Sequence, residues 1–445
     1  IPLWRRILSV IIITLLSLFT MFDRYVTAGV LERLEEYYSI SNTWGGLLQT
    51  FYVLFYVICL LVVGMVGDRM SRRIIIIFSS TLWIIFMIAS SFIPSDMFWL
   101  FLIIRSLTSI GIASVTALSP SLFADYFTGS ARGYCLMVFF MSLPIGGSSS
   151  VAIGSFFLHS DNFLWSLRIC PIIAIPLLIV TIIFLEEPIR GGLENNQEEE
   201  GKNDNTIVQD VMKILTVKSF WLSCLPTMLI NFYLSGQSWW GSTYMENAIK
   251  SDNGTTNAFH GLSYNDWMGI TSLITCIVGI FGSAIGVTFS ESWRDGKGCF
   301  KRIKTIRAPA LTVGIGSLLG IPLVFAYILL INKDIIASIV STSINSIFCG
   351  GIFPLDIEII LLVIPSSRRA AALAIMNILM CVTGDAPAPF IIGFISDLFL
   401  NGSEDASEKF YSLQKSLLIA QGIASIAFIF GFINAYIFPS EMIEE

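Results

Sequence analysis

The stretch LLVVGMVGDRMSRRIIIIFSS, residues 60–80, places a short charged loop between two apolar runs. The runs extend outward over residues 44–66 and 74–95. Each is long enough to cross a bilayer as a helix, which takes about 20 residues. The charges of the loop belong to Asp68, Arg69, Arg72 and Arg73. The pattern predicts two membrane-spanning helices joined by a tight loop at one membrane surface.

The remainder of the chain repeats this apolar pattern. Of its 445 residues, 55% are hydrophobic and only 13% are charged, whereas soluble domains carry about 25% charged residues. We therefore predict an all-α membrane protein with twelve transmembrane helices. Their expected spans are 7–30, 44–66, 74–95, 98–126, 132–158, 166–186, 219–245, 265–289, 308–331, 335–364, 370–396 and 412–438.

An acidic, amide-rich stretch separates the sixth and seventh spans. Its sequence, EEPIRGGLENNQEEEGKNDNTIVQDVMKILTVK over residues 186–218, is typical of a solvated linker because it has too few apolar residues to bury itself. From Thr206 onward it has the pattern of a short amphipathic surface helix. We expect an N-terminal six-helix bundle at 1–190, a cytoplasmic acidic linker at 191–218 and a C-terminal six-helix bundle at 219–445.

The positively charged residues predict the orientation. Most of the 26 lysines and arginines fall in loops on one side of the predicted membrane, which the positive-inside rule assigns to the cytoplasm. Both chain termini are expected on that side. Two glycosylation sequons, at Asn253 and Asn401, fall in loops on the other side. The chain starts with Ile rather than Met, so we expect the natural N-terminus, with any sorting signal, to precede it.

Several classes of function lack a motif in this sequence. The eight cysteines show no CxxC spacing and the two histidines lie near predicted loops, so we expect no metal site. No basic patch indicates nucleic acid, and no nucleophile or phosphate-binding motif indicates an enzyme. We therefore expect a protein that is not an enzyme, needs no cofactor and binds no nucleic acid.

The charged loop at residues 64–73, with the spacing G-x-x-x-D-R-x-x-R-R, resembles the signature loop of the major facilitator superfamily. The layout of two six-helix bundles matches that family. A weaker loop, ESWRDGKGCFKR at residues 291–302, lies at the equivalent place in the second half, as expected of an internal repeat.

The resemblance implies that the loop works as a conformational latch. Its candidate residues are Gly64, Asp68, Arg69, Arg72, Arg73 and Asp125. Within it, Gly64 would let two helices pack closely, and Asp125 is a candidate partner for Arg69. The alternative is that the charges are ordinary cytoplasmic anchors.

A closer resemblance is to the Spinster family of transporters. It is carried by the strings FDRYVTAGVL, GLLQTFYVLFY, GDRMSRR, LWSLRICP, EEPIRGG and RRAAALAIMNILMCVTGDAPAPFIIGFISD. That family moves sphingolipids or lysophospholipids, in some members coupled to protons. The resemblance implies a secondary transporter that works by alternating access on a small amphipathic substrate, of the lysophospholipid or sphingosine-1-phosphate type. We expect a monomer among membrane lipids, in the lysosomal, late-endosomal or plasma membrane.

Three of the predicted spans carry charged residues far from their ends. Asp23 and Arg24 are in the first span, Arg105 is in the fourth and Asp385 is in the eleventh. A charge at the bilayer centre costs about 2.5–3.5 kcal/mol on insertion scales. Adjacent residues on a helix do not face each other, so Arg105 is the candidate partner of Asp23, or a ligand of an anionic headgroup. We interpret all four as candidate substrate-binding or proton-binding residues, with a purely structural ion-pair network as the alternative.

The seventh and tenth spans hold further candidates. In NFYLSGQSWWGSTY, the residues Asn231, Trp239 and Tyr244 are candidates to line a cavity, although aromatic residues also gather at membrane interfaces. In the tenth span, Asp356 and Glu358 are either gating residues that face the arginines of the next loop or solvated end charges.

Three positions depart from the Spinster pattern. Ile112 replaces a glutamate of the fourth span, Ser346 replaces a glutamate of the tenth, and Cys381 replaces a histidine of the eleventh. Coupling to protons would then rest on Asp23, together with Asp385. Two alternatives to lipid transport stay open: a facilitator or antiporter of a small organic anion, and a membrane sensor that does not transport.

Overall fold

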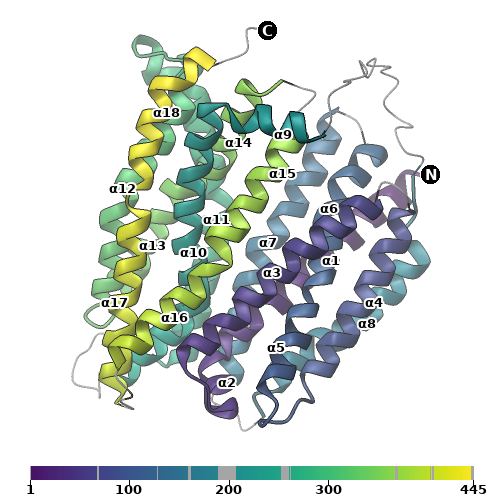
Figure 1. The fold of residues 1–445 in the computed structure, drawn as a ribbon, viewed down its shortest axis with the longest axis vertical. Helices are drawn as coiled ribbons and strands as arrows, with labels where there is room; N and C mark the ends of the chain where they lie inside the picture. Colours follow the sequence, from purple (N-terminus) through teal and green to yellow (C-terminus); the bar gives the residue numbers. More distant parts are fainter. Residues whose placement is uncertain are drawn as a thin grey trace. The chain divides into compact units, whose positions relative to one another are not determined.

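The computed structural model is built from helices (Figure 1). It describes residues 2–67, 70–127, 129–158, 162–188, 207–251, 260, 262–365, 369–400, 402 and 405–441. Over these ranges no residue is in a β-strand, which confirms the all-α prediction. By its internal contacts the chain divides into two units. Unit 1 comprises Ile1–Gly201 with Met268–Leu273, and unit 2 comprises Lys202–Trp267 with Ile274–Glu445.

Unit 1 holds the first six spans. Its helices are α1 (Leu3–Gly29), α2 (Leu31–Tyr38), α3 (Asn42–Gly67), α4 (Arg72–Ser90), α5 (Phe98–Leu107), α6 (Ser109–Tyr126), α7 (Gly129–Leu158) and α8 (Trp165–Phe184). Helices α5 and α6 together form one span, interrupted at Thr108. The Thr108 hydroxyl and backbone N–H both donate to the carbonyl of Arg105, at 2.7 and 3.3 Å. The break therefore begins at the charged residue of this span.

Small residues bring α1 and α7 into direct backbone contact. A Cβ atom on Gly154 would lie 2.9 Å from the Cα of Gly29, and one on Gly146 would lie 2.5 Å from the carbonyl oxygen of Leu18. Helices approach this closely only where side chains are absent. The glycine-rich face of α7 therefore covers one side of α1, and the charged residues of α1 are directed toward other helices.

Unit 2 holds the remaining spans, apart from Met268–Leu273 of α11, which group with unit 1. Its elements are α9 (Ile207–Leu215), α10 (Lys218–Ser251), α11 (Tyr264–Asp295), the 3₁₀-helix η2 (Gly298–Arg302), α12 (Ala308–Leu330), α13 (Ile335–Gly350), α14 (Ile352–Val363), α15 (Arg369–Leu379), the π-helix η4 (Met380–Asp385), α16 (Pro387–Leu400), α17 (Ala406–Ala424) and α18 (Ala427–Glu441). Three of its spans are helix pairs, with the breaks at Gly351, within η4 and after Ala424. A stretch of π-helix frequently marks a functional site.

The observed helices match all twelve predicted spans. In the described part of the chain, eleven are long and apolar enough to cross a membrane by composition alone. The twelfth, α10, is a 34-residue helix whose Asn, Gln and Ser residues lower its hydropathy. Both α10 and α11 run beyond their predicted ends, to Ser251 and Asp295, because their last turns are polar and give no hydropathy signal.

The predicted linker lies largely outside the described residues. Its last part forms α9, where the sequence predicts a short amphipathic helix from Thr206 onward. Ile214 of α9 is buried in the core of unit 2, near Phe220 and Ile360. The apolar face of α9 therefore packs on unit 2.

Candidate functional site

The charged residues of α1 and α5 meet inside unit 1. Asp23 and Arg105 are 1% and 3% exposed, and Nη1 of Arg105 lies 2.5 Å from Oδ1 of Asp23. A second guanidinium nitrogen donates to the backbone carbonyl of Asp23, and Nε donates to Oγ1 of Thr27 at 3.0 Å. The remaining carboxylate oxygen, Oδ2, accepts from Nε1 of Trp83 on α4, at 3.0 Å.

This arrangement satisfies every nitrogen of the Arg105 guanidinium and both oxygens of the Asp23 carboxylate. A buried ion pair is stable only with such geometry, since the loss of solvation exceeds the attraction between the two charges when hydrogen bonds are missing. The structure thus brings together two of the candidate residues that the sequence indicates. The structure also shows two partners of this ion pair, Trp83 and Thr27, that the sequence analysis did not identify. Both residue types are common in apolar spans, so neither gives a signal in the sequence.

Arg24 points away from this pair, as adjacent helical positions require. Its Nε and Nη2 atoms donate to the side-chain oxygen of Gln49 on α3, at 3.1 and 2.6 Å. The guanidinium also stacks near the rings of Tyr25 and Tyr52, at 5.0 and 5.7 Å, a distance at which aromatic faces attract cations. Sequence reasoning missed Gln49, although a lone amide within the apolar run of the second span was the available signal.

The latch region also holds a partly buried ion pair. Nη2 of Arg72 contacts the Asp125 carboxylate. The backbone N–H of Arg72 donates to Oε1 of Glu187 at 2.9 Å. The sequence makes Asp125 a candidate partner of Arg69, and that pairing stays a prediction; among the described residues, Asp125 forms an ion pair with Arg72. Asp68 and Arg69 lie outside the described residues.

Gly67 is the glycine at which α3 packs closely within unit 1. A Cβ atom on Gly67 would lie 2.8 Å from Leu118. Gly64, one helical turn earlier, is exposed, and a Cβ atom built on it meets nothing within 4 Å. Close packing at Gly64 therefore stays a prediction.

Further basic residues gather at this end of unit 1. Arg5 pairs with Glu186, and Arg73 donates to the backbone carbonyl of Ile182 at 2.7 Å. The first contact joins the start of α1 to the residues that follow α8. The second joins the start of α4, next to the latch loop, to the end of α8.

The candidates on α10 separate into two groups. Asn231 lines a cavity of about 240 Å³ in unit 2. Trp239 and Tyr244 are instead fully buried. The Tyr244 hydroxyl donates to the carbonyl of Ile328 at 2.6 Å, and its ring stacks on Phe410. In this structure Trp239 and Tyr244 offer no surface to a substrate, because they belong to the packing of unit 2.

The acidic residues of unit 2 have three different surroundings. Asp385, half-buried, ends η4, and its backbone carbonyl accepts from the Ser235 hydroxyl at 3.0 Å. Glu358 forms an ion pair with Arg294 of α11; the side chains of the loop arginines, Arg368 and Arg369, lie outside the described part of the chain. Asp356 is 1% exposed and so is not a solvated end charge.

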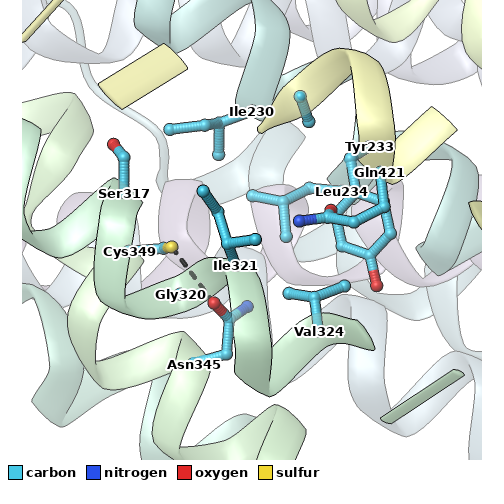
Figure 2. Close-up of a pocket in the computed structure, with 11 residues that line it drawn as sticks. Ile230, Tyr233, Leu234, Ser317, Gly320, Ile321, Val324, Asn345, Cys349 and Gln421 are labelled. Carbon is cyan, nitrogen blue, oxygen red and sulfur yellow. Dashed lines mark hydrogen bonds between the residues drawn. The ribbon is translucent and has the colours of Figure 1, made fainter. Parts of the chain in front are cut away.

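A second, smaller cavity adjoins the first (Figure 2). Its volume of about 20 Å³ is about that needed for one water. The Tyr233 hydroxyl and Oε1 of Gln421 face buried space without a hydrogen-bond partner among the described atoms, and Asn345 accepts from the Cys349 thiol at 3.3 Å. Both cavities are lined by Ile230, Leu234 and Cys349. Unit 2 therefore contains a polar, water-sized space next to a larger cavity.

The three departures from the Spinster pattern add little polarity. Ile112 is buried, the Ser346 hydroxyl donates to the carbonyl of Thr342 in its own helix at 3.0 Å, and Cys381 is a buried residue of η4. Over the described residues, no group of three His, Cys, Asp or Glu side chains could hold a metal ion.

The fold and the charges within its spans define the class: a polytopic helical membrane transporter. The Major Facilitator Superfamily profile matches residues 13–389. Protein spinster homolog 1 of Xenopus laevis is 30% identical over 400 residues, covering 89% of this chain and 74% of that protein. The sphingosine-1-phosphate transporter of Xenopus tropicalis is 26% identical over 440 residues, covering 98% and 83%.

A solved structure shares the fold. The crystal structure of a bacterial homologue of the human lysosomal transporter Spinster, in an inward-facing, unoccupied conformation, matches with a TM-score of 0.82 and 18% identity over 99% of each chain. This chain belongs to the Spinster family within the major facilitator superfamily. It is a secondary transporter and not an enzyme.

Proposed function

We propose that this transporter moves a single-chain lipid with an anionic headgroup, of the lysophospholipid or sphingosine-1-phosphate type. The observation that carries the proposal is the buried cluster of Asp23, Arg24 and Arg105. These three residues, one acid and two bases, sum to one positive charge inside a membrane-spanning bundle. A relative is named as a sphingosine-1-phosphate transporter.

Arg24 is the headgroup ligand in this proposal. The guanidinium of Arg105 is already bound by the Asp23 carboxylate and the Thr27 hydroxyl, and the guanidinium of Arg24 lies beside the Gln49 amide and the Tyr52 ring. A guanidinium binds phosphate through two parallel hydrogen bonds. An anionic headgroup beside Arg24 would balance the charge of the cluster.

The latch region supports an orientation. In this proposal the basic end of unit 1, with Arg5, Arg72 and Arg73, faces the cytoplasm, as the positive-inside rule favours, and the N-terminal end of α1 lies on that side. In this proposal the C-terminal end of α18 lies on the same side. The membrane is lysosomal, late-endosomal or plasma membrane.

A binding measurement on the purified full chain tests the headgroup assignment. Labelled sphingosine-1-phosphate is bound in a non-ionic detergent, with lysophosphatidylcholine, sphingosine and a short dicarboxylate as competitors. We expect lysophosphatidylcholine, which carries a phosphate, to compete, sphingosine to compete poorly and the dicarboxylate not to compete. Arg24→Gln should weaken binding about tenfold or more, since a hydrogen bond to a charged group contributes about 1.5–3 kcal/mol.

Arg33→Gln is the matched control. Arg33 is exposed and pairs with Glu36 three residues along the same helix, so its loss should leave lipid binding unchanged. Competition by the dicarboxylate and not by lipids would overturn the proposal in favour of an organic-anion transporter. The absence of binding by a folded wild type would also overturn it.

A further inference from the structure

Asp356 of α14 is a buried carboxyl group without a compensating cation. It is 1% exposed, and no lysine, arginine or histidine of the described chain forms an ion pair with it. One oxygen, Oδ2, lies 2.6 Å from Oγ1 of Thr227 on α10. The other, Oδ1, is buried and has no hydrogen-bond partner among the described atoms.

The contrast with Asp23 decides the charge state. Asp23 has Arg105 and Trp83 on its two oxygens, so its charged form is compensated. An ionised Asp356 would have a single hydrogen bond in an apolar core, and an isolated buried carboxylate of this kind becomes neutral instead.

The hydrogen bonds around Thr227 fit a neutral carboxylic acid. Thr227 Oγ1 lies 2.6 Å from Asp356 and 3.4 Å from the carbonyl of Ser223, and it carries only one hydrogen. If the Asp356 carboxyl donates to Thr227, then Thr227 can donate to Ser223, and each hydroxyl hydrogen has an acceptor. If Asp356 is ionised, Thr227 must donate its one hydrogen to Oδ2 and cannot donate to Ser223. Oδ1 has no partner in either case, and this costs more when the carboxyl group is charged.

We propose that Asp356 is a proton-binding site of unit 2, reached from the adjacent cavity through Thr227. Thr227 and Asn231 both line the cavity of about 240 Å³, and the water-sized space beside it holds the polar groups of Tyr233 and Gln421. A hydronium ion in the cavity gives its proton to Thr227 Oγ1 while the Thr227 hydrogen passes to Oδ2 of Asp356. The products are water and a neutral carboxyl group.

Few other titratable groups surround this site. Cys224 of α10 lies beside Asp356, and Cys349 of α13 lines the cavity. On α14 itself the other acid, Glu358, pairs with Arg294. On α18, Glu441 accepts from the backbone N–H of Ser219 at 2.8 Å. Helix α12 contributes no charged residue, and the Arg369 side chain of α15 is not among those described.

This inference rests on the proposed function and deepens it, because it names the coupling ion and its site. Loss of the proton would place an uncompensated charge between α10 and α14 and oppose their packing. The sequence analysis expected coupling at Asp23 with Asp385. The compensated geometry of Asp23 favours Asp356 for the proton that enters and leaves.

Infrared difference spectroscopy tests the protonation directly. The reconstituted full chain is recorded at neutral pH, and the spectrum of Asp356→Asn is subtracted from that of wild type. We expect the carbonyl band of a protonated carboxyl group in this difference, with a shift in heavy water. Glu358→Gln is the matched control. The difference between the wild-type spectrum and the Glu358→Gln spectrum should lack the band. No such band for Asp356→Asn would overturn the proposal.

A second variant keeps the test decisive if Asp356→Asn does not fold. Thr227→Val has nearly the same shape and removes only the hydroxyl. We expect the same carboxyl band to move to higher frequency, because its hydrogen bond is lost, and its hydrogen-to-deuterium exchange to slow. An unchanged band position would overturn the assignment.

Transport separates this inference from the proposed function. We expect an inward proton gradient to stimulate lipid uptake by wild type and to have no effect on uptake by folded Asp356→Asn. Stimulation that persists in Asp356→Asn would overturn the coupling role. If wild type moves no lipid at all, the proposed function fails, while the infrared band still decides whether Asp356 binds a proton.

Discussion

The Arg105 guanidinium holds Asp23 by its side chain and by its backbone carbonyl at once. This double contact fixes α5 to α1 at the point where the fourth span breaks. Both oxygens of the Asp23 carboxylate are partnered, whereas Oδ1 of Asp356 has no partner among the described atoms. One buried carboxyl group is thus compensated by a cation, and the other has no such partner among the described residues.

Removal of one member of the Asp23–Arg105 pair should destabilise the protein strongly. For Asp23→Leu we expect a loss of about 3–5 kcal/mol, because Arg105 is left buried and unpaired. The measurement is denaturant-induced unfolding in detergent. The double variant Asp23→Leu with Arg105→Leu should lose less than either single variant.

Two results would argue against this interpretation. The first is a double variant that loses the sum of the two single losses. The second is a loss for Asp23→Leu no greater than that for Arg33→Gln, which breaks an exposed pair contributing about 0–1 kcal/mol.

The Arg72–Asp125 pair should control the rate of conformational exchange. We expect Arg72→Gln to slow lipid uptake severalfold while lipid binding in detergent stays near the wild-type value, since the pair lies away from Arg24. Uptake into proteoliposomes checks the rate. The charge exchange Arg72→Asp with Asp125→Arg should recover part of it.

Arg73→Gln provides the control for the latch, because Arg73 is half-buried and donates to the backbone carbonyl of Ile182 rather than to an acidic side chain. If Arg73→Gln slowed uptake as much as Arg72→Gln, the charge of the loop and not the specific pair would be responsible.

The contact between α1 and α7 should not tolerate a methyl group. For Gly154→Ala we expect a loss of about 1–3 kcal/mol, typical of overpacking, since the added Cβ would lie 2.9 Å from the Cα of Gly29. Thermal unfolding in detergent measures it. Gly64→Ala, where the added atom meets nothing within 4 Å, should be nearly neutral; equal losses at the two sites would refute the packing explanation.

The shape of Arg24 should matter as well as its charge. Arg24→Lys keeps the charge but loses the planar donor pair to Gln49 and the stacking on Tyr52. We expect its affinity for sphingosine-1-phosphate to lie between those of wild type and Arg24→Gln. An affinity for Arg24→Lys equal to that of wild type would indicate a purely electrostatic site.

The sequence predicted the spans well because hydropathy and length are local properties. It also flagged Asp23 and Arg105, since a charge in an apolar run is visible without a structure. It did not identify Arg72 as the partner of Asp125, or Trp239 and Tyr244 as packed residues. These facts depend on the rotation of each helix about its axis, and adjacent positions differ by about 100°.

The burial of Asp356 could not be predicted from the sequence either. Near the end of a span, an acid can face solvent or the core, and the sequence analysis left both open. The outcome is set by the packing of α14 on α10, which brings Thr227 to the carboxyl group. No spacing rule within the tenth span contains that information.

The most direct test of lipid transport is the uptake of labelled sphingosine-1-phosphate and lysophospholipid into proteoliposomes that contain the full chain. We predict saturable uptake above that of empty vesicles for at least one of the two lipids, and a reduction in Arg24→Gln but not in Arg33→Gln. Uptake of neither lipid by a folded wild type, with and without a proton gradient, would contradict the proposed function.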